Sequence, residues 1–273
     1  MKYTQSGFEL WFEIHKPNNI KTDTPSKAIN LLIHGWTGNR TRLQFIQDPL
    51  MELGHSIALI DLPGHGESSH NDNFDYDLDK VADLIDAFIR NIIIHEEGFK
   101  GINIIGHSMG GVIAQIIASK KPDYLNKLVL IVTSPNPMKG KKIGYRILSI
   151  LFPLVQRRFL KNDKKKKLAM GIEHFPEFNQ ENNGNRLLPN HKAIAKYLKA
   201  IVKTNLESKI RNIKCPVLII MGEKDSFGDS KAIEIFEKNF VNKQIIIIEN
   251  TEHYPFITHK EKCIEVIQEF FSW

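Results

Sequence analysis

The stretch INIIGHSMGG, residues 102–111, decides the fold of this chain of 273 amino acids. Its first four residues form a mainly apolar run that predicts a buried strand, and the pattern from Met109 to Lys120 predicts a helix. A sharp turn from strand to helix brings neighbouring backbone close, so glycines are needed two residues before and two residues after Ser108. Such a turn presents a hydroxyl at the end of the strand, and Ser108 is therefore predicted to be a nucleophile.

Strands and helices alternate on both sides of this turn. Further strands are expected at residues 8–14, 29–33, 56–60, 127–132, 216–221 and 244–248, and further helices at 41–53, 77–95, 229–240 and 259–271. Strands that alternate with helices of this length are typical of parallel β-α-β units. The expected fold class is α/β, with a mostly parallel central sheet flanked by helices.

The alternation breaks after Ser134. Residues 135–205 are basic, helical in pattern and partly amphipathic, and we interpret them as an inserted helical cap. The core domain is then expected to consist of residues 1–134 and 206–273, so the insertion divides the core in the sequence.

A serine hydroxyl needs a base, and the base needs a third group to orient it. Asp225 follows the expected strand 216–221, and His253 follows the strand that ends near Ile248. Both lie at carboxyl ends of strands, where α/β sheets place their ligands. Asp225 and His253 are therefore the expected acid and base; the open alternatives are Glu223 or Asp229 for the acid and His259 for the base.

An oxyanion hole for acyl transfer uses the amide after the nucleophile and a second amide from a loop behind an early strand. The amide after Ser108 is that of Met109. The sequence HGW at residues 34–36 forms such a loop, and Trp36 is the expected second donor. The alternative for Trp36 is that its side chain only lines the pocket.

Four segments together resemble the α/β-hydrolase superfamily, in its cap-bearing branch of serine esterases, lipases and thioesterases. They are GHSMGG at 106–111, HGW at 34–36, DLPGHGES at 61–68 and GEKD at 222–225. In that family the segment corresponding to 61–68 is structural, so the resemblance gives His65 and Ser68 no catalytic role. The chain departs from the family at Glu252, where glycine is usual, and at Thr258, where an acidic residue is usual.

The resemblance implies a serine hydrolase that cleaves a carboxylic ester or thioester of a small or medium apolar acyl substrate through an acyl-enzyme. Alternatives are a carbon–carbon bond hydrolase or a cofactor-free haloperoxidase of the same superfamily, or a slow-turnover ligand sensor that keeps the triad. Ser108 disfavours the branches with a nucleophilic aspartate. No cofactor and no metal are expected, and the sequence does not indicate the natural substrate or its acyl length.

The composition, with 42% hydrophobic and 25% charged residues, is that of a globular protein, and the formal net charge is +6. Basic residues are dense in the expected cap, where the run 164–167 is read as a solvated helix face or as a weak contact with anionic membrane surfaces. The lysines are not interleaved with stacking aromatic residues, so no nucleic-acid partner is expected.

The location expected from the sequence is cytoplasmic. The first fifteen residues lack the features of a secretory signal, and the longest apolar run, near 147–155, is too short to span a bilayer. Cys215 and Cys263 are expected to be buried, reduced thiols. The sequence gives no indication of the oligomeric state.

Overall fold

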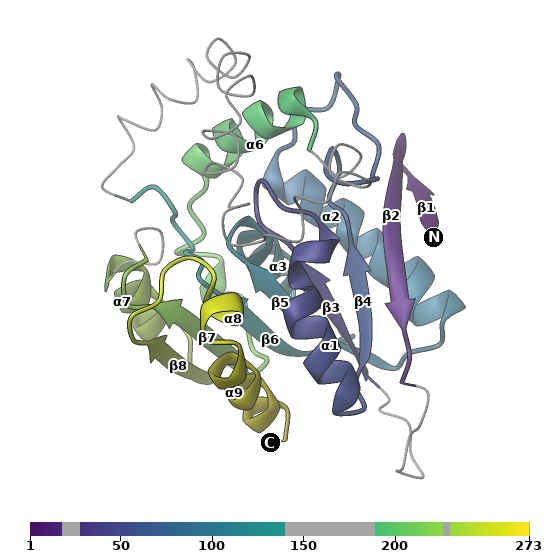
Figure 1. The fold of residues 1–273 in the computed structure, drawn as a ribbon. Helices are drawn as coiled ribbons and strands as arrows, with labels where there is room; N and C mark the ends of the chain where they lie inside the picture. The colour runs from purple at the N-terminus through teal and green to yellow at the C-terminus, as the bar shows by residue number, and fades with distance from the viewer. Residues whose placement is uncertain (18–27, 140–188, 226–229, 273) are drawn as a thin grey trace.

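The computed structural model describes residues 1–17, 28–139, 189–225 and 230–272. Its strands form one sheet in the order β1-β2-β4-β3-β5-β6-β7-β8, in which β2 pairs antiparallel with β1 and β4 and all other pairs are parallel (Figure 1). The strands are β1 Lys2–Gln5, β2 Phe8–His15, β3 Ala28–Ile33, β4 Ser56–Ile60, β5 Gly101–His107, β6 Leu125–Ile131, β7 Val217–Gly222 and β8 Lys243–Ile248. The expected α/β class with a mostly parallel sheet is confirmed.

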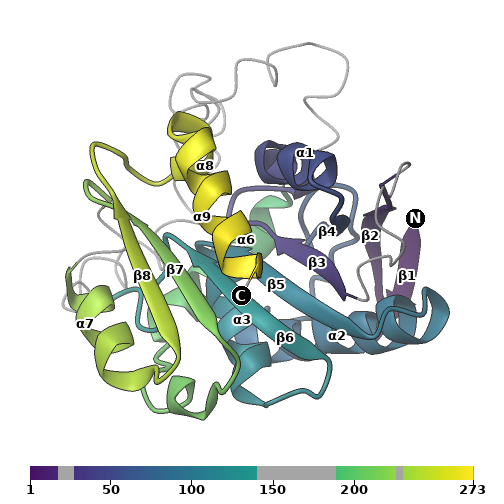
Figure 2. The ribbon, with the colours of Figure 1, turned by 90° about the horizontal axis from the view of Figure 1, so that it is seen from below.

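Helices cover both faces of the sheet, with α1 and α9 on one face and α2 and α3 on the other (Figure 2). The helices are α1 Gln44–Glu52, α2 Leu78–Phe88, α3 Met109–Ser119, α6 His191–Lys203, α7 Ser230–Asn239, α8 Pro255–Thr258 and α9 Lys260–Ser272. Shorter segments are the 3-10 turns η1 Arg40–Leu43 and η5 Ile210–Asn212 and the π-helical segment η2 Ile89–Glu96, which continues α2.

The central strands are apolar on both sides because each side faces a helix layer. In β3, Leu31 and Ile33 belong to the core on the α2 and α3 side, whereas Leu32 belongs to the core on the α1 and α9 side. All three side chains are fully buried. This explains why the sequence shows short continuous apolar runs here rather than alternation of polar and apolar residues.

Helix α6 lies across the end of the sheet at which the parallel strands finish (Figure 1). The hydroxyl of Tyr197 donates to the carbonyl of Pro63 at 3.1 Å, and the indole nitrogen of Trp36 donates to the carbonyl of Ile194 at 3.0 Å. Two loops of the core therefore attach this helix directly. Residues 140–188 of the expected cap, which include the lysine run, lie outside the described residues, and the division into core and cap stays a prediction.

The elements differ from the sequence-based expectation at the two ends of the chain. The short strand β1, which the sequence did not indicate, pairs with β2 at the edge of the sheet. The last helix expected at 259–271 is α9. The short helix α8, which the sequence did not indicate, precedes it, and His259 lies in the turn between the two. Thr258 ends α8, and its hydroxyl oxygen lies 2.7 Å from that of Thr251.

Both cysteines are free thiols, with Cys263 buried and Cys215 partly buried, and burial raises the pKa of Cys215 to about 11. Across the described ranges, no helix combines the length and the apolar character that a bilayer crossing requires.

Candidate active site

Ser108 lies in the turn between β5 and α3, in a backbone conformation that non-glycine residues rarely adopt, with φ of 53° and ψ of −117°. Its amide donates to the carbonyl of Ile131 at 3.0 Å, which holds the turn against β6. A Cβ atom at Gly106 would lie 2.6 Å from the carbonyl oxygen of Gly110, so the turn closes only with glycine at that position. The strained conformation observed at Ser108 is the kind that proteins maintain at functional positions.

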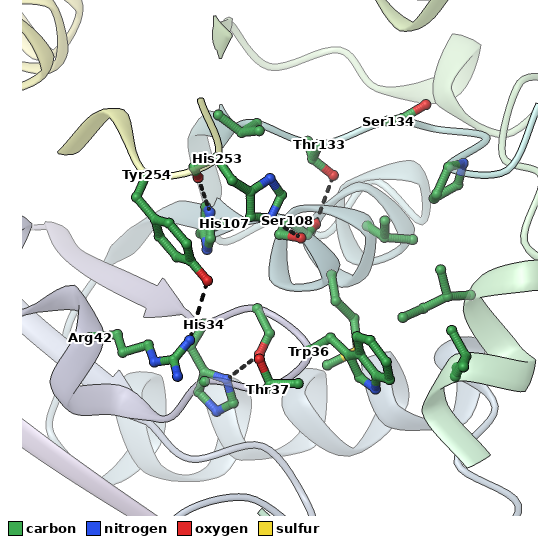
Figure 3. A pocket seen from close by; sticks show the side chains of 18 of the residues that line it. His34, Trp36, Thr37, Arg42, His107, Ser108, Thr133, Ser134, His253 and Tyr254 are labelled. Carbon is green, nitrogen blue, oxygen red and sulfur yellow. Dashed lines mark hydrogen bonds between the residues drawn. The ribbon is translucent and has the colours of Figure 1, made fainter. Parts of the chain in front are cut away.

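The structure brings Ser108, His253 and Asp225 together (Figure 3 labels the first two). Nε2 of His253 lies 3.0 Å from the hydroxyl oxygen of Ser108, and Nδ1 lies 2.9 Å from Oδ2 of Asp225. A carboxylate can only accept, so Nδ1 carries the proton and Nε2 is left to accept from the serine hydroxyl. The three groups thus form a chain of hydrogen bonds from a buried carboxylate to a hydroxyl in the cavity wall.

The residues that competed with these in the sequence lie elsewhere or are not described. Glu223 is exposed and accepts from the amide of Asn250 at 2.9 Å. Nδ1 of His259 lies 3.0 Å from the hydroxyl of Thr258. Asp229 lies outside the described residues. Glu252, which stands where the resemblance leads one to expect glycine, is exposed to solvent.

His34 orients the peptide that joins Gly35 to Trp36. The amide of Leu62 donates to Nε2 of His34 at 3.0 Å, so the ring proton lies on Nδ1, which donates to the carbonyl of Gly35 at 2.8 Å (Figure 3). The amide of Gly38 donates to the same carbonyl at 3.0 Å. In a trans peptide the carbonyl and the N–H point in opposite directions. The amide of Trp36 is therefore directed away from the His34 ring, as a donor for an oxyanion requires.

The neighbouring segment 61–68 supports this loop from behind. Nε2 of His65 hydrogen bonds to the carbonyl of Trp36, and burial lowers the pKa of His65 to about 4, so its ring is neutral at pH 7. Asp61 accepts from Arg40 and from the amide of Glu67, and the hydroxyl of Ser68 donates to the carbonyl of Asp61. These contacts are structural, as the resemblance implied for this segment.

His107 holds the loop that carries His253. Its Nε2 lies 2.9 Å from the carbonyl oxygen of His253, and burial keeps the pKa of His107 well below its usual value. A neutral ring can donate one hydrogen bond, and the partner of Nε2 is a carbonyl, which can only accept, so Nε2 is the protonated nitrogen. Sequence reasoning gave His107 no role, although a polar residue within a buried strand end was a signal that it has a specific partner.

A cavity opens beside Ser108 and His253, and mainly apolar side chains surround it. Apolar wall residues include Met109, Val112, Val132, Leu198 and Ile201, of which the last two belong to α6. Gly35 and Trp36 line the same cavity, so both expected oxyanion donors, the amides of Met109 and Trp36, belong to residues of its wall. Met109 begins α3, where amides have no acceptor within the helix.

Metal ligands would have to gather as groups of His, Cys, Asp and Glu side chains. In the described part of the chain no three such side chains are grouped in this way. The expectation of no metal and no cofactor stays a prediction.

Three comparisons relate the chain to known proteins. The family model described as "Serine aminopeptidase, S33" matches residues 24–259. A pimeloyl-[acyl-carrier protein] methyl ester esterase of Aeromonas hydrophila is 25% identical over 248 residues, which cover 88% of this chain and 94% of the relative.

Solved structures share the fold. An esterase from Exiguobacterium antarcticum aligns with a TM-score of 0.77 at 20% identity, covering 98% of this chain and 97% of its own. A bromoperoxidase from Bacillus anthracis aligns with a TM-score of 0.78 at 18% identity, with the same coverage of both chains. At such identities the structural likeness establishes the fold alone.

Proposed function

Because the chain belongs to the family described as serine aminopeptidase, S33, within the α/β-hydrolase superfamily, we propose that Ser108, His253 and Asp225 are the catalytic triad of a carboxylic ester hydrolase. The observation that carries this proposal is the pair of hydrogen bonds, 3.0 Å and 2.9 Å, that joins the three side chains. The chain is an ester hydrolase by its likeness to esterases over nearly their whole length.

In the proposed reaction Ser108 attacks the ester carbonyl while His253 accepts the hydroxyl proton. Asp225 holds the imidazole in the reactive tautomer and stabilises the imidazolium that forms. The amides of Met109 and Trp36 bind the tetrahedral oxyanion, and His253 then gives its proton to the leaving alcohol. Water then attacks the acyl-enzyme while His253 accepts a proton from it. His253 returns this proton to Ser108, and the carboxylic acid is released.

The substrate is proposed to be a small or medium acyl ester or thioester. Apolar side chains form most of the wall next to Ser108, and pockets of this kind bind apolar parts of ligands. We further propose that residues 135–205 are the inserted cap, and that α6 is the part of it that contributes Leu198 and Ile201 to the wall. The relative from Aeromonas hydrophila is named for a methyl ester, which is consistent with a small alcohol as the leaving group.

The test is hydrolysis of p-nitrophenyl esters from acetate to palmitate by the wild type and by Ser108→Ala. Replacing the nucleophile is expected to lower kcat by about 10³-fold or more, because the attacking atom is lost. Ser119→Ala, at the far end of the helix that follows Ser108, is the matched control: that hydroxyl donates to the carbonyl of Ile116, and the variant should retain full activity.

Other bond types are separated by parallel assays with a thioester, an aminoacyl anilide and a diketone. If the wild type cleaved the anilide or the diketone in a Ser108-dependent way and left every ester intact, the ester proposal would be wrong and the triad would stand. If Ser108→Ala hydrolysed esters at the wild-type rate, the triad itself would be wrong.

A further inference from the structure

An arginine lies in the wall of the same cavity as Ser108 and His253. Arg42 belongs to the turn η1, which follows the loop that carries Trp36. Arg42 is only 6% exposed. Nη1 of its guanidinium donates to the hydroxyl of Tyr254 at 3.3 Å, and Tyr254 directly follows His253. Figure 3 shows the guanidinium next to the tip of the Tyr254 side chain, on the same side as His34.

Arg40 and Arg42 stand two residues apart in η1 but have different surroundings. Arg40 forms ion pairs with Glu13, Asp61 and Glu67, which hold the segment 61–68 against β2. Arg40 thus has a complete structural explanation. Arg42 donates to a phenol hydroxyl and lines the cavity. A guanidinium stays protonated in proteins, so Arg42 brings a permanent positive charge to the cavity wall.

The charge of Arg42 acts on the groups around it. Burial is the main cause that lowers the pKa values of His34, His65 and His107, and the charge of Arg42 lowers each of them further. His34 and His107 line the cavity and are neutral, so they do not bring competing positive charge. Among the described wall residues, this end of the cavity therefore combines a permanent cation with a hydroxyl, while the α6 side is apolar.

We propose that Arg42 and the hydroxyl of Tyr254 form a subsite for a carboxylate of the substrate, so that the preferred esters carry an acid group at the end that does not react. The substrate class is the half-ester of a dicarboxylic acid. This inference rests on the proposed function, because it concerns the pocket of the same Ser108.

A carboxylate matches this subsite better than a phosphate does. The planar fork of a guanidinium binds two carboxylate oxygens at once, and the phenol hydroxyl can donate a further hydrogen bond. A carboxylate carries one negative charge and balances one arginine. A phosphate monoester is tetrahedral and carries up to two negative charges, which one planar guanidinium matches less well.

The experiment compares matched substrates that differ only in the remote group. Monoethyl esters of dicarboxylic acids with four to eight carbons are tested against ethyl esters of the monocarboxylic acids of equal length. The wild type is expected to show a higher kcat/KM for the half-ester at one chain length. Arg42→Gln should lower the ratio of the two kcat/KM values by about 10- to 100-fold, as loss of a charged hydrogen bond does.

Two further variants separate recognition from general damage. Tyr254→Phe removes one hydrogen bond to the carboxylate and should lower the same ratio by about 3- to 10-fold. Arg90→Gln removes an equal charge from an exposed position in η2, where Arg90 pairs with Asp86 of α2, and should leave both the ratio and the basal rate unchanged. A wild type that prefers the neutral ester at every length would overturn the subsite, even if Arg42→Gln failed to fold.

Binding without turnover separates this inference from the proposed function. Calorimetry with Ser108→Ala should detect adipate and show weaker binding of its neutral analogue adipamide. If neither ester series were hydrolysed but adipate bound preferentially, the subsite would stand and the proposed function would be wrong. If esters were hydrolysed but adipate and adipamide bound equally, the function would stand and the subsite would be wrong.

Discussion

Three buried histidines hydrogen bond to the main chain around the groups that we propose to react. His34 donates to the carbonyl of Gly35, and His65 and His107 bond to the carbonyls of Trp36 and His253. Burial lowers the pKa of all three rings, which favours the neutral form of each. They are positioning residues, because their contacts are with the backbone of the groups that we propose to act on the substrate.

His107 offers a test of this positioning. His107→Phe keeps an aromatic ring in the space but removes the donor to the carbonyl of His253, so kcat should fall by about 10- to 100-fold. KM should change by less than about threefold, because the cavity wall keeps its shape. Steady-state kinetics on the best p-nitrophenyl ester measure both values.

His107→Gln restores a donor and should recover part of the lost kcat. A role limited to packing predicts the opposite order, with phenylalanine tolerated better than glutamine. Equal kcat values for the two variants would therefore contradict the positioning role.

The sequence located Ser108, Asp225 and His253 because each follows a recognisable strand or motif. It could not locate their supports, since these depend on contacts between distant segments. His107 and His253 are 146 residues apart, and Arg42 and Tyr254 are 212 residues apart. No local pattern marks such pairs, and a buried histidine or arginine in a sequence looks the same whether or not it lines a cavity.

At the scale of elements, the apolar runs predicted the central strands well because both faces of those strands are buried. The strand β1 was missed because its sequence, KYTQ, is short and mostly polar, and it pairs only at the sheet edge. The last helix was predicted within a residue of α9, but the four-residue helix α8 that Pro255 starts just before it was missed. A segment this short is less than two turns of helix, so apolar spacing does not reveal it.

Helix α6 provides a prediction about substrate length. Leu198 on this helix is buried and lines the cavity, so Leu198→Trp should fill part of the space available to an acyl chain. The rate on p-nitrophenyl palmitate should fall at least about tenfold relative to acetate, because each excluded methylene removes binding energy in the transition state. The ratio of kcat/KM values across the ester series measures the shift.

Tyr197→Phe is the matched change on the preceding residue of α6. This change removes the hydrogen bond to the carbonyl of Pro63. Tyr197 is not among the residues that line the cavity, so the cavity wall stays the same. It should lower stability by about 1 kcal/mol and leave the chain-length preference unchanged. An unchanged preference in Leu198→Trp would mean that the acyl chain does not pass along α6.

At the scale of the whole molecule, the buried histidines link folding to pH. Burial lowers the pKa of His65 from 6.5 to about 4, so between these values the unfolded chain binds a proton that the folded chain does not. The stability due to its neutral ring is complete above pH 6.5 and is lost as the pH falls from 6.5 towards 4. The free energy of unfolding should decrease by up to about 1.4 kcal/mol per pH unit for each such histidine.

Urea unfolding at pH 7.5, 6.5 and 5.5 measures how the free energy of unfolding depends on pH. Substitution of one histidine isolates the contribution of that ring. His65→Gln removes the titrating group, so the decrease in the free energy of unfolding below pH 6.5 should be smaller than in the wild type by about 1 kcal/mol per pH unit. His70→Gln, at an exposed position five residues later, should leave the slope of the wild type unchanged. If His65→Gln kept that slope as well, His65 would not be the neutral ring that holds the Trp36 carbonyl, and the support of the oxyanion loop would have to come from other contacts.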